Sequence, residues 1–273
     1  MSSLPTPQTA GGRAALAALL DEPARALLAI DYDGTLAPIV DQPERAVAHP
    51  RAASALGALA ELVGRVAIVT GRAAADAVRL GALSGIPGLV VLGHYGLERW
   101  SDGRVSTPST HPGVPAARRG AAALVADGPA GLFLEDKGHS VAVHSRRAAD
   151  PAGALAVIRP RVEQLARDSG LVVTPGRYVL ELRPADTDKG TALGALVAES
   201  DPTVVVFIGD DVGDLAAVTA LRAWDIKGLV VCSDSEESPP QFREQADLVV
   251  TGPRGVVEFL ESLAKEIVSS PSR

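Results

Sequence analysis

The chain has 273 residues, of which 26 are Lys or Arg and 33 are Asp or Glu, so its formal net charge is −7. This acidic balance excludes a general nucleic-acid-binding protein, which presents a basic surface to phosphates. Apolar residues make up 47% of the chain and charged residues 22%, which excludes a disordered protein and fits one large or two modest domains. The single cysteine, Cys232, excludes a disulfide framework and is typical of a reducing compartment.

The first residues predict no targeting segment, and the following apolar stretch predicts no membrane span. The first twelve residues are polar and contain Pro and Gly, with no basic stretch ahead of an apolar one. The apolar stretch at 14–30 is interrupted by the charged, proline-containing segment 21–25, so it is too short to cross a bilayer. We therefore expect a cytoplasmic protein that binds neither membranes nor nucleic acids.

In the first part of the chain, short apolar runs alternate with amphipathic stretches, a pattern that is typical of α/β proteins. We expect buried strands at 27–30, 66–69 and 89–92. A helix is predicted from Pro50 to Val63, because proline is favoured in a first helical turn. The stretch 101–115 contains three prolines and predicts a linker or a domain boundary.

The middle of the chain predicts a different arrangement from its two ends. There we expect helices at 116–125 and 151–168 and strands at 132–138, 140–146, 171–173 and 178–182. Strands that are neighbours in sequence favour antiparallel pairing. From Lys189 the alternation returns, with strands at 204–208, 228–231 and 248–250 and a last helix at 256–267.

These patterns predict an α/β protein with two parts. A parallel-sheet, Rossmann-like core is built from residues 1–107 and 186–273, and it forms the catalytic domain. A smaller α/β domain is inserted at 108–185. Insertions of this kind often cover an active site as a lid.

Two carboxylates follow the first predicted strand, in the segment Asp31-Tyr32-Asp33-Gly34-Thr35. Ligands of open α/β sheets bind beyond the carboxyl ends of the strands. Carboxylates this close resist ionising together unless a positive charge joins them, and Mg²⁺ prefers such oxygen ligands together with a substrate phosphate. Gly34 permits a sharp turn, and Thr35 adds a hydroxyl. The alternative interpretation is an ordinary Asp- and Gly-rich turn.

Three further segments favour a phosphate site. The hydroxyl and amides of Thr70-Gly71-Arg72, which ends another strand, can face a phosphoryl oxygen. Lys189, one of only four lysines, opens a helix, where a positive charge is unfavourable unless it is held there for an anion. More carboxylates follow the strand at 204–208, in Gly209-Asp210-Asp211-Val212-Gly213-Asp214. Thr-Gly-Arg alone is typical of an ordinary turn, but the four segments in this order are specific.

With DYDGT, Thr70, Lys189 and GDD as its four motifs, the chain resembles the haloacid dehalogenase superfamily of phosphatases. In the middle of the chain, the segments LEDKG (134–138), AVHSR (142–146) and PGRYVLELRP (175–184) are similar to cap-domain signatures of trehalose-6-phosphate phosphatases. The resemblance extends from about Ala29 to Ala217. It implies a haloacid-dehalogenase-like core with a cap, and a Mg²⁺-dependent hydrolysis of trehalose 6-phosphate to trehalose and phosphate.

The resemblance also implies roles for the residues of the four motifs. Asp31 attacks phosphorus and forms an aspartyl-phosphate. Asp33 protonates the leaving sugar oxygen and then activates the water that cleaves this intermediate. Thr70 and Lys189 are catalytic groups that bind the phosphoryl oxygens and stabilise their charge. Substrate-binding positions next to them are Thr35, Gly71 and Arg72.

For the metal, the resemblance implies that Mg²⁺ is held by Asp31, the main-chain carbonyl of Asp33, and Asp210. Asp211 and Asp214 then lie outside its immediate ligands and orient them.

For the sugar, the resemblance implies that the hydroxyls of trehalose are contacted by Glu98, Glu135, Lys137, Arg146 and Glu181. Carboxylates suit that task because one group accepts hydrogen bonds from two adjacent hydroxyls. The alternative is an exposed strand end for Glu135 and Lys137 and an exposed charge pair for Arg146. His139 and His144 have no third ligand nearby in sequence, so we do not expect a zinc site there.

The chain departs from the family at two segments. The family usually has a histidine directly before the glycine of its HGxE segment, whereas Tyr95 precedes Gly96 here. In the last motif, Gly213 and Leu215 stand where the family commonly has threonine and glutamate. The first departure leaves a phosphatase for another disaccharide or sugar phosphate as an alternative.

A second alternative is a non-catalytic sugar-phosphate sensor or a partner subunit of a trehalose-phosphate synthase. The complete set Asp31, Asp33, Thr70, Lys189 and Asp210 argues against lost catalysis. A functional link to such a synthase is also compatible with an active enzyme.

Overall fold

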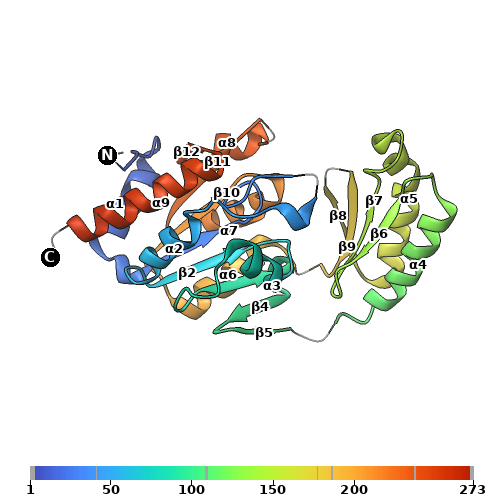
Figure 1. Ribbon diagram of the computed structural model, residues 1–273, viewed down its shortest axis with the longest axis horizontal. Coiled ribbons are helices and arrows are strands. Elements are labelled where there is room, and N and C mark those ends of the chain that lie inside the picture. Colours follow the sequence, from blue (N-terminus) through green and yellow to red (C-terminus); the bar gives the residue numbers. More distant parts are fainter. Residues whose placement is uncertain are drawn as a thin grey trace. The chain divides into compact units, whose positions relative to one another are not determined.

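The computed structural model describes residues 4–40, 42–107, 110–176, 178–185, 187–236 and 238–270. The chain divides into two compact units, which Figure 1 shows coloured along the sequence. Unit 1 comprises Met1–Thr107 and Asp188–Arg273, and unit 2 comprises Pro108–Thr187. The predicted α/β class, with a parallel-sheet core and a smaller inserted α/β unit, is confirmed. No helix in the described ranges is long and apolar enough to cross a membrane.

Unit 1 is built on an eight-stranded sheet with the spatial order β12-β11-β10-β1-β2-β3-β4-β5. The strands from β12 to β3 pair in parallel, and β4 and β5 add an antiparallel edge. Their bounds are β1 Ala26–Ile30, β2 Arg65–Val69, β3 Val90–Gly93, β4 Glu98–Ser101, β5 Arg104–Ser106, β10 Val204–Gly209, β11 Lys227–Asp234 and β12 Leu248–Thr251.

Both faces of this sheet are covered by helices, and this explains why its central strands are continuous apolar runs. In β1, Leu28 and Ile30 join the hydrophobic cluster on one face, and Leu27 and Ala29 join the cluster on the other. The first cluster includes α1 (Ala10–Asp21), α2 (Ala52–Ala60), α3 (Ala74–Gly81) and α9 (Gly252–Ser269). The second includes α6 (Lys189–Ser200), α7 (Leu215–Ala223) and α8 (Pro240–Gln245).

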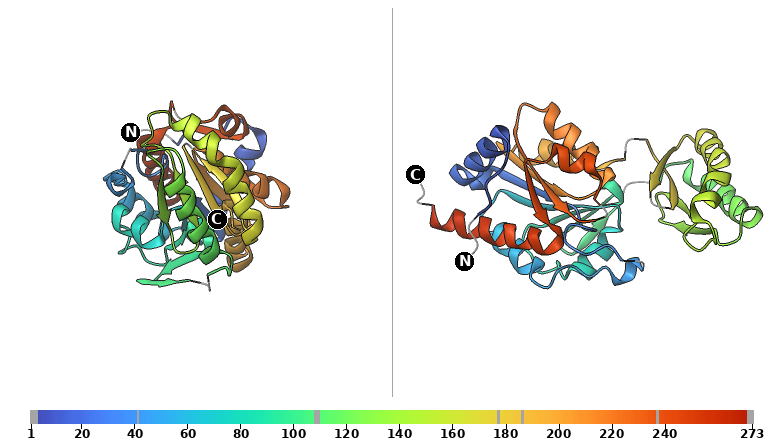
Figure 2. Two further views of the ribbon diagram at one scale, coloured as in Figure 1. Left: turned by 90° about the vertical axis from the view of Figure 1, so that its right-hand side faces the viewer. Right: turned by 90° about the horizontal axis from the view of Figure 1, so that it is seen from above.

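Unit 2 is a four-stranded antiparallel sheet, in the order β6-β7-β9-β8, with two helices on one face (Figure 2). The strands are β6 (Phe133–Asp136), β7 (Val141–His144), β8 (Val172–Gly176) and β9 (Val179–Arg183), and the helices are α4 (Val114–Asp127) and α5 (Pro151–Ser169). Alternate residues, including Val143 and Leu180, pack against the helices. The opposite face carries Phe133, Glu135, His144 and Glu181, and we call it the polar face.

The structure corrects two local predictions and contains one hairpin that was not predicted. The stretch 101–115 is not only a linker, because it contains β5 and the start of α4. The β4–β5 hairpin was not predicted, since its short edge strands are mostly polar; its turn is made by Asp102 and Gly103, both with positive φ. The helix predicted from Pro50 to Val63 already ends at Ala60.

Candidate active site

The motif residues of unit 1 meet because the strands that precede them are parallel neighbours. Strands β1 and β10 pair in register up to Ile30 and Ile208, and the Asp31 amide donates to the Ile208 carbonyl at 2.8 Å. Asp31 and Asp210 therefore leave the same edge of the sheet side by side. The approach is close at Gly34 (φ +75°), where an added Cβ would lie 2.0 Å from Oδ2 of Asp210. Only glycine fits this turn.

Lys189 joins two carboxylates at this edge. Its Nζ lies 2.7 Å from Oδ1 of Asp31 and 2.6 Å from Oδ1 of Asp214, and all three side chains are buried. Burial by itself lowers the pKa of Lys189, but the charges of Asp214 and Asp31 raise it well above its usual range. The ammonium is therefore held in its charged form, although it sits at the first turn of α6, where the helix dipole disfavours it.

Burial and mutual repulsion disfavour the ionised forms of the carboxylates at this edge. Burial raises the pKa of Asp31 well above its usual range, and Asp214 and Asp210 add to the shift while Lys189 opposes it. Burial also raises the pKa of Asp210 to about 8, with further contributions from Asp214 and Asp211. The pKa of Asp214 is raised by burial as well. A cation bound here would favour the ionised forms.

The donor set fits a hard metal ion. Asp31, Asp210 and Asp214 each offer a carboxylate oxygen, and these oxygens lie within 4.8 Å of one another. Both oxygens of Asp214 already have partners, since Oδ1 accepts from Lys189 and Oδ2 accepts from the amides of Asp210 and Asp211. Asp214 is thus placed to orient the lysine and the loop, and Asp31 and Asp210 are the candidate side-chain ligands for a metal ion.

The Asp33 side chain points to an arginine rather than to the other carboxylates. Its two oxygens accept from Nε and Nη2 of Arg72 at 2.6 and 2.5 Å. Arg72 is held from two further sides, because Nη1 donates to the Pro43 carbonyl at 2.7 Å and the guanidinium lies 5.4 Å from the centroid of the Tyr32 ring. Arg72, predicted as a substrate-binding residue, is therefore the partner of the predicted acid.

The Thr70-Gly71-Arg72 loop rests on the segment that follows β3. The amides of His94 and Tyr95 donate to the carbonyls of Arg72 and Thr70, at 2.8 and 2.9 Å. His94 and Tyr95 both have positive φ, 47° and 59°, which is unfavourable for residues with side chains. An added Cβ at Gly71 would lie 2.7 Å from the Tyr95 hydroxyl oxygen. The Tyr95 side chain thus occupies the space that a Cβ at position 71 would need, which explains why that residue is glycine.

Glu98 is occupied by the main chain of unit 1. Its Oε2 accepts from the Ala74 amide at 2.8 Å, at the start of α3, whose own N-cap residue Ala73 makes no side-chain cap. The Glu98 side chain is 15% exposed, and Oε1 lies 3.7 Å from Nε2 of His94. The structure shows Glu98 as a helix cap that holds the loop after Thr70.

On unit 2, the structure brings together two of the four predicted sugar-binding residues. Nζ of Lys137 lies 2.9 Å from Oε2 of Glu181, and the Ser140 hydroxyl donates to Oε1 at 2.5 Å. Glu135 lies on the same polar face, with Oε2 at 2.8 Å from Nε2 of His144. Arg146 is exposed in the loop after β7. Arg177, part of the quoted PGRYVLELRP segment, lies outside the described residues.

Sequence reasoning missed two serines, one that supports the turn at Gly34 and one that supports the Glu181 carboxylate. Ser233, at the end of β11, is buried and donates to the Gly34 carbonyl at 2.7 Å, which fixes the turn between Asp33 and Thr35. Ser140 holds Glu181, as described above. Neither serine lies in a motif, and the Ser233 contact joins residues 199 positions apart, so the local sequence carries no signal for it.

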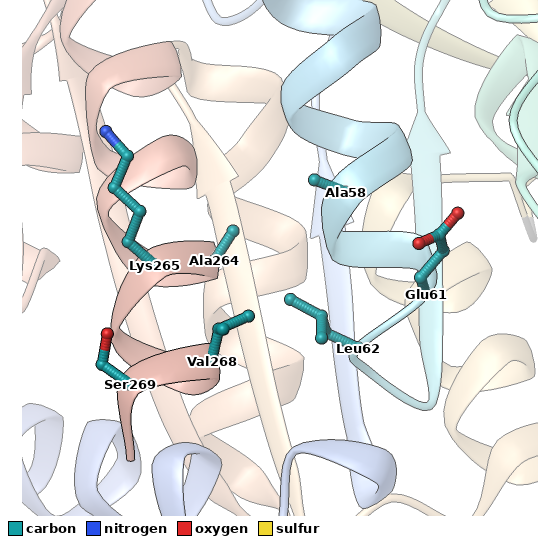
Figure 3. Close-up of a pocket in the computed structure, with 7 residues that line it drawn as sticks. All are labelled: Ala58, Glu61, Leu62, Ala264, Lys265, Val268 and Ser269. Carbon is teal, nitrogen blue, oxygen red and sulfur yellow. The ribbon is translucent and has the colours of Figure 1, made fainter.

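A shallow groove lies elsewhere on unit 1, between α2 and α9 (Figure 3). It has a volume of about 380 Å³ and is lined by Ala58, Glu61, Leu62, Ala264, Lys265, Val268 and Ser269. Leu62 precedes β2, so this groove lies toward the amino end of that strand, whereas the motif residues follow carboxyl ends. It is separate from the candidate active site.

Comparison with known proteins finds a matching family and several relatives. The family model described as Trehalose-phosphatase matches residues 29–247. The trehalose-phosphate phosphatase of Mycobacterium tuberculosis (strain H37Rv) is 34% identical over 257 residues, which cover 89% of this chain and 62% of that relative. The chain thus spans about three fifths of the length of this curated relative.

Two solved structures have the same fold. The trehalose-6-phosphate phosphatase of Aspergillus fumigatus is 24% identical, with a TM-score of 0.69 over 96% of this chain and 99% of that one. The C-terminal domain of the C. albicans trehalose-6-phosphate phosphatase is 20% identical, with a TM-score of 0.74 over 97% and 99% of the two chains.

Proposed function

Because the chain belongs to the trehalose-phosphatase family, we propose that it is a phosphatase that hydrolyses trehalose 6-phosphate to trehalose and phosphate. The observation that carries this proposal is the buried Asp31–Lys189–Asp214 arrangement at the ends of β1 and β10. A buried carboxylate held against a lysine is suited to attack a phosphoryl group whose charge the lysine stabilises.

In the first step of the proposed reaction, a carboxylate oxygen of Asp31 forms a bond to phosphorus while the bond from phosphorus to the sugar oxygen breaks. Asp33 donates a proton to that leaving oxygen, which requires the Asp33 carboxyl group to leave the Arg72 guanidinium that both of its oxygens contact in this structure. In the second step Asp33 takes a proton from water, which attacks phosphorus and releases phosphate and Asp31. Thr70 and Lys189 bind the phosphoryl oxygens in both steps.

We propose Mg²⁺ as the metal. Its ligands in this chain are the carboxylates of Asp31 and Asp210 and the main-chain carbonyl of Asp33, with Asp211 and Asp214 outside the immediate set. When bound, Mg²⁺ neutralises the charge that the phosphoryl group brings next to the carboxylates. The donor set supports this assignment, because buried carboxylate oxygens that lie within 4.8 Å of one another favour a bound cation.

We assign selection of the sugar to unit 2. The side chains proposed for this task are Glu135, Lys137, Arg146 and Glu181, whose carboxylates and cations suit the hydroxyls of a disaccharide. The contacts of Glu181 support the assignment, since this buried carboxylate is held in one orientation by Lys137 and Ser140. Glu98 joins the substrate site in the proposal, although its present partner is the Ala74 amide.

The proposal also extends to the setting of the enzyme. We place it in the cytoplasm, which suits the single buried thiol of Cys232. A trehalose-phosphate synthase is the proposed functional partner, because it supplies the phosphorylated disaccharide that this reaction consumes.

A second candidate function is hydrolysis of another sugar phosphate. The specific observation that favours it is Tyr95, whose ring lies against Gly71 where the family usually has a histidine before its glycine. Tyrosine is larger than histidine, and Tyr95 lies beside the Thr70-Gly71-Arg72 loop. It therefore changes the space that is available to the substrate.

The test is phosphate release from trehalose 6-phosphate, sucrose 6-phosphate, glucose 6-phosphate and p-nitrophenyl phosphate, each with Mg²⁺ and with EDTA. We expect the highest kcat/KM for trehalose 6-phosphate and loss of activity in EDTA. A preference for one of the other sugars would support the second candidate. Calorimetric binding of trehalose 6-phosphate without phosphate release would identify a sensor and contradict both.

A further inference from the structure

Three side chains of unit 2 form a stack on the polar face. Phe133 of β6 and His144 of β7 are directly opposite in the strand register, and their rings stack with centroids 4.7 Å apart and an interplanar angle of 6°. The Arg147 guanidinium lies 4.1 Å from the centroid of the Phe133 ring. Because His144 covers one side of that ring, Arg147 lies over the other side. The imidazole plane is thus set by packing.

The imidazole has one hydrogen-bonding edge with a partner and one without. Nε2 of His144 lies 2.8 Å from Oε2 of Glu135. Nδ1 is buried and has no hydrogen-bond partner among the described residues. A proton on Nδ1 would therefore be a buried donor without an acceptor, which is unfavourable. The favoured tautomer carries its proton on Nε2 and donates it to the Glu135 carboxylate.

The two partners differ in how firmly their surroundings hold them. The His144 side chain is 15% exposed and stacked, whereas the Glu135 side chain is 47% exposed. An exposed glutamate has several accessible rotamers, and binding a sugar through it costs the entropy of selecting one. A donor on a rigid ring selects a rotamer before the substrate arrives.

We propose that His144 is a positioning residue that orients the Glu135 carboxylate for the sugar of the substrate, with Phe133 and Arg147 holding the imidazole in place. The inference rests on the proposed function, in which Glu135 binds sugar hydroxyls. It adds three residues to the recognition of the sugar that have no part in the chemistry at phosphorus.

The experiment compares two substitutions at the same position in the full chain. His144→Phe keeps a flat ring to stack on Phe133 but removes the Nε2 donor, and His144→Gln keeps an N–H donor at a similar reach without the imidazole. Kinetics are measured with p-nitrophenyl phosphate, which has no sugar, and with the sugar phosphate that the wild type hydrolyses best among the four substrates of the panel. Thermal unfolding of both variants is recorded alongside.

For His144→Phe we expect KM for the sugar phosphate to rise about five- to tenfold, with kcat within about twofold and p-nitrophenyl phosphate kinetics unchanged. His144→Gln should restore at least half of the lost affinity. A merely structural role would instead change both substrates together, or neither. Phe133→Leu, which removes the stacking partner, should raise KM for the sugar phosphate about twofold to fivefold.

Unchanged KM for the sugar phosphate in His144→Phe would overturn the inference, as would equal losses on both substrates. Failure of the proposed function has a different signature, because it is read from the wild type alone as a preference for another phosphate ester. The variants are then judged on that preferred sugar phosphate. If the wild type shows no preference for any sugar phosphate over p-nitrophenyl phosphate, Glu135 selects no sugar and the inference is overturned too.

Discussion

The two units place their charged groups in opposite environments. In unit 1, Asp31, Lys189, Asp210 and Asp214 are all at most 4% exposed, and each is held by partners from other segments of the chain. On the polar face of unit 2, Glu135 is about half exposed, whereas Glu181 is buried. Groups that act on a phosphoryl bond have to be pre-oriented and shielded from water, whereas groups that select a sugar can meet it from a wetter surface.

The units also differ in charge, in the direction opposite to the proposed chemistry. Residues 108–187 contain ten Lys or Arg and eight Asp or Glu, whereas the rest of the chain contains 16 and 25. The phosphate is nevertheless assigned to the more acidic unit. Net charge describes the field of a whole surface, and one buried lysine beside a carboxylate cluster that fits a cation is a local feature. The following predictions test this division of labour.

The largest effect is expected for Asp31→Asn in unit 1. Loss of the nucleophile should lower kcat by at least about a thousandfold for sugar phosphates and p-nitrophenyl phosphate alike. Stability should fall less than in a variant that removes Lys189, because the lysine keeps its ion pair with Asp214. Phosphate release and thermal unfolding check both statements, with the fully exposed Asp201→Asn as the control. Residual activity near the wild-type level would show that another group attacks phosphorus.

Lys189→Met should damage both chemistry and fold. The change leaves Asp31 and Asp214 buried without their shared cation, which costs about 3–5 kcal/mol of unfolding free energy and lowers kcat about a hundredfold or more. Urea unfolding and phosphate release measure these losses. Lys265→Met, at an exposed lysine, is the matched control. A variant as stable as the wild type would mean that the two ion pairs contribute nothing to the fold.

Glu181→Gln tests whether unit 2 acts on the sugar alone. Removing the charge that pairs with Lys137 should lower kcat/KM for trehalose 6-phosphate about ten- to a hundredfold while hydrolysis of p-nitrophenyl phosphate stays unchanged. The control is Glu163→Gln, at an ion pair on the surface of α5. Equal losses on both substrates would contradict the separation of the two units' roles.

The carboxylate cluster should make the stability of metal-free protein fall as pH rises. The pKa of Asp210 is about 8 in the folded protein against 3.8 in the unfolded chain. Between these pH values the folded state binds more protons than the unfolded chain. The stabilisation that protonated Asp210 contributes is therefore fully present below about pH 4 and is lost as pH rises toward 8. Scanning calorimetry in EDTA should show a Tm several degrees lower at pH 8 than at pH 5 from this group.

Two additions sharpen this measurement. Mg²⁺ should raise Tm more at pH 8 than at pH 5, because it binds the ionised carboxylates. Asp210→Asn should reduce both the slope with pH and the response to Mg²⁺. An equal response to Mg²⁺ in that variant would remove Asp210 from the metal ligands.

The smallest effect is expected at Glu98, and it decides which role this residue has. Glu98→Ala removes the cap of α3 and should cost about 1 kcal/mol, seen as a lower urea midpoint. Glu98→Gln keeps an oxygen acceptor for the Ala74 amide and should stay within about 0.5 kcal/mol. If Glu98→Gln loses activity on trehalose 6-phosphate but not on p-nitrophenyl phosphate, the residue contacts the sugar as well.

Much of the fold was predictable because its central strands are short, apolar and buried on both faces. The strand predicted at 27–30 is β1, which begins one residue earlier, and the strand at 66–69 is contained in β2. The β4–β5 hairpin was missed because edge strands with exposed side chains lack that pattern. The strands of unit 2 were found for the opposite reason: one of their faces packs on helices and is regularly apolar.

The sequence by itself determined that this is an α/β protein with an inserted unit, and that carboxylates and a lysine follow the ends of particular strands. Local patterns suffice for this, because strand burial and turn residues are properties of neighbouring positions. Which groups pair was decided only by the tertiary structure: Lys189 with Asp31 and Asp214, Asp33 with Arg72, and Glu98 with the start of α3. These contacts depend on which strands are neighbours in the sheet and on how deeply each charge is buried, and neither is written in the spacing of residues along the chain.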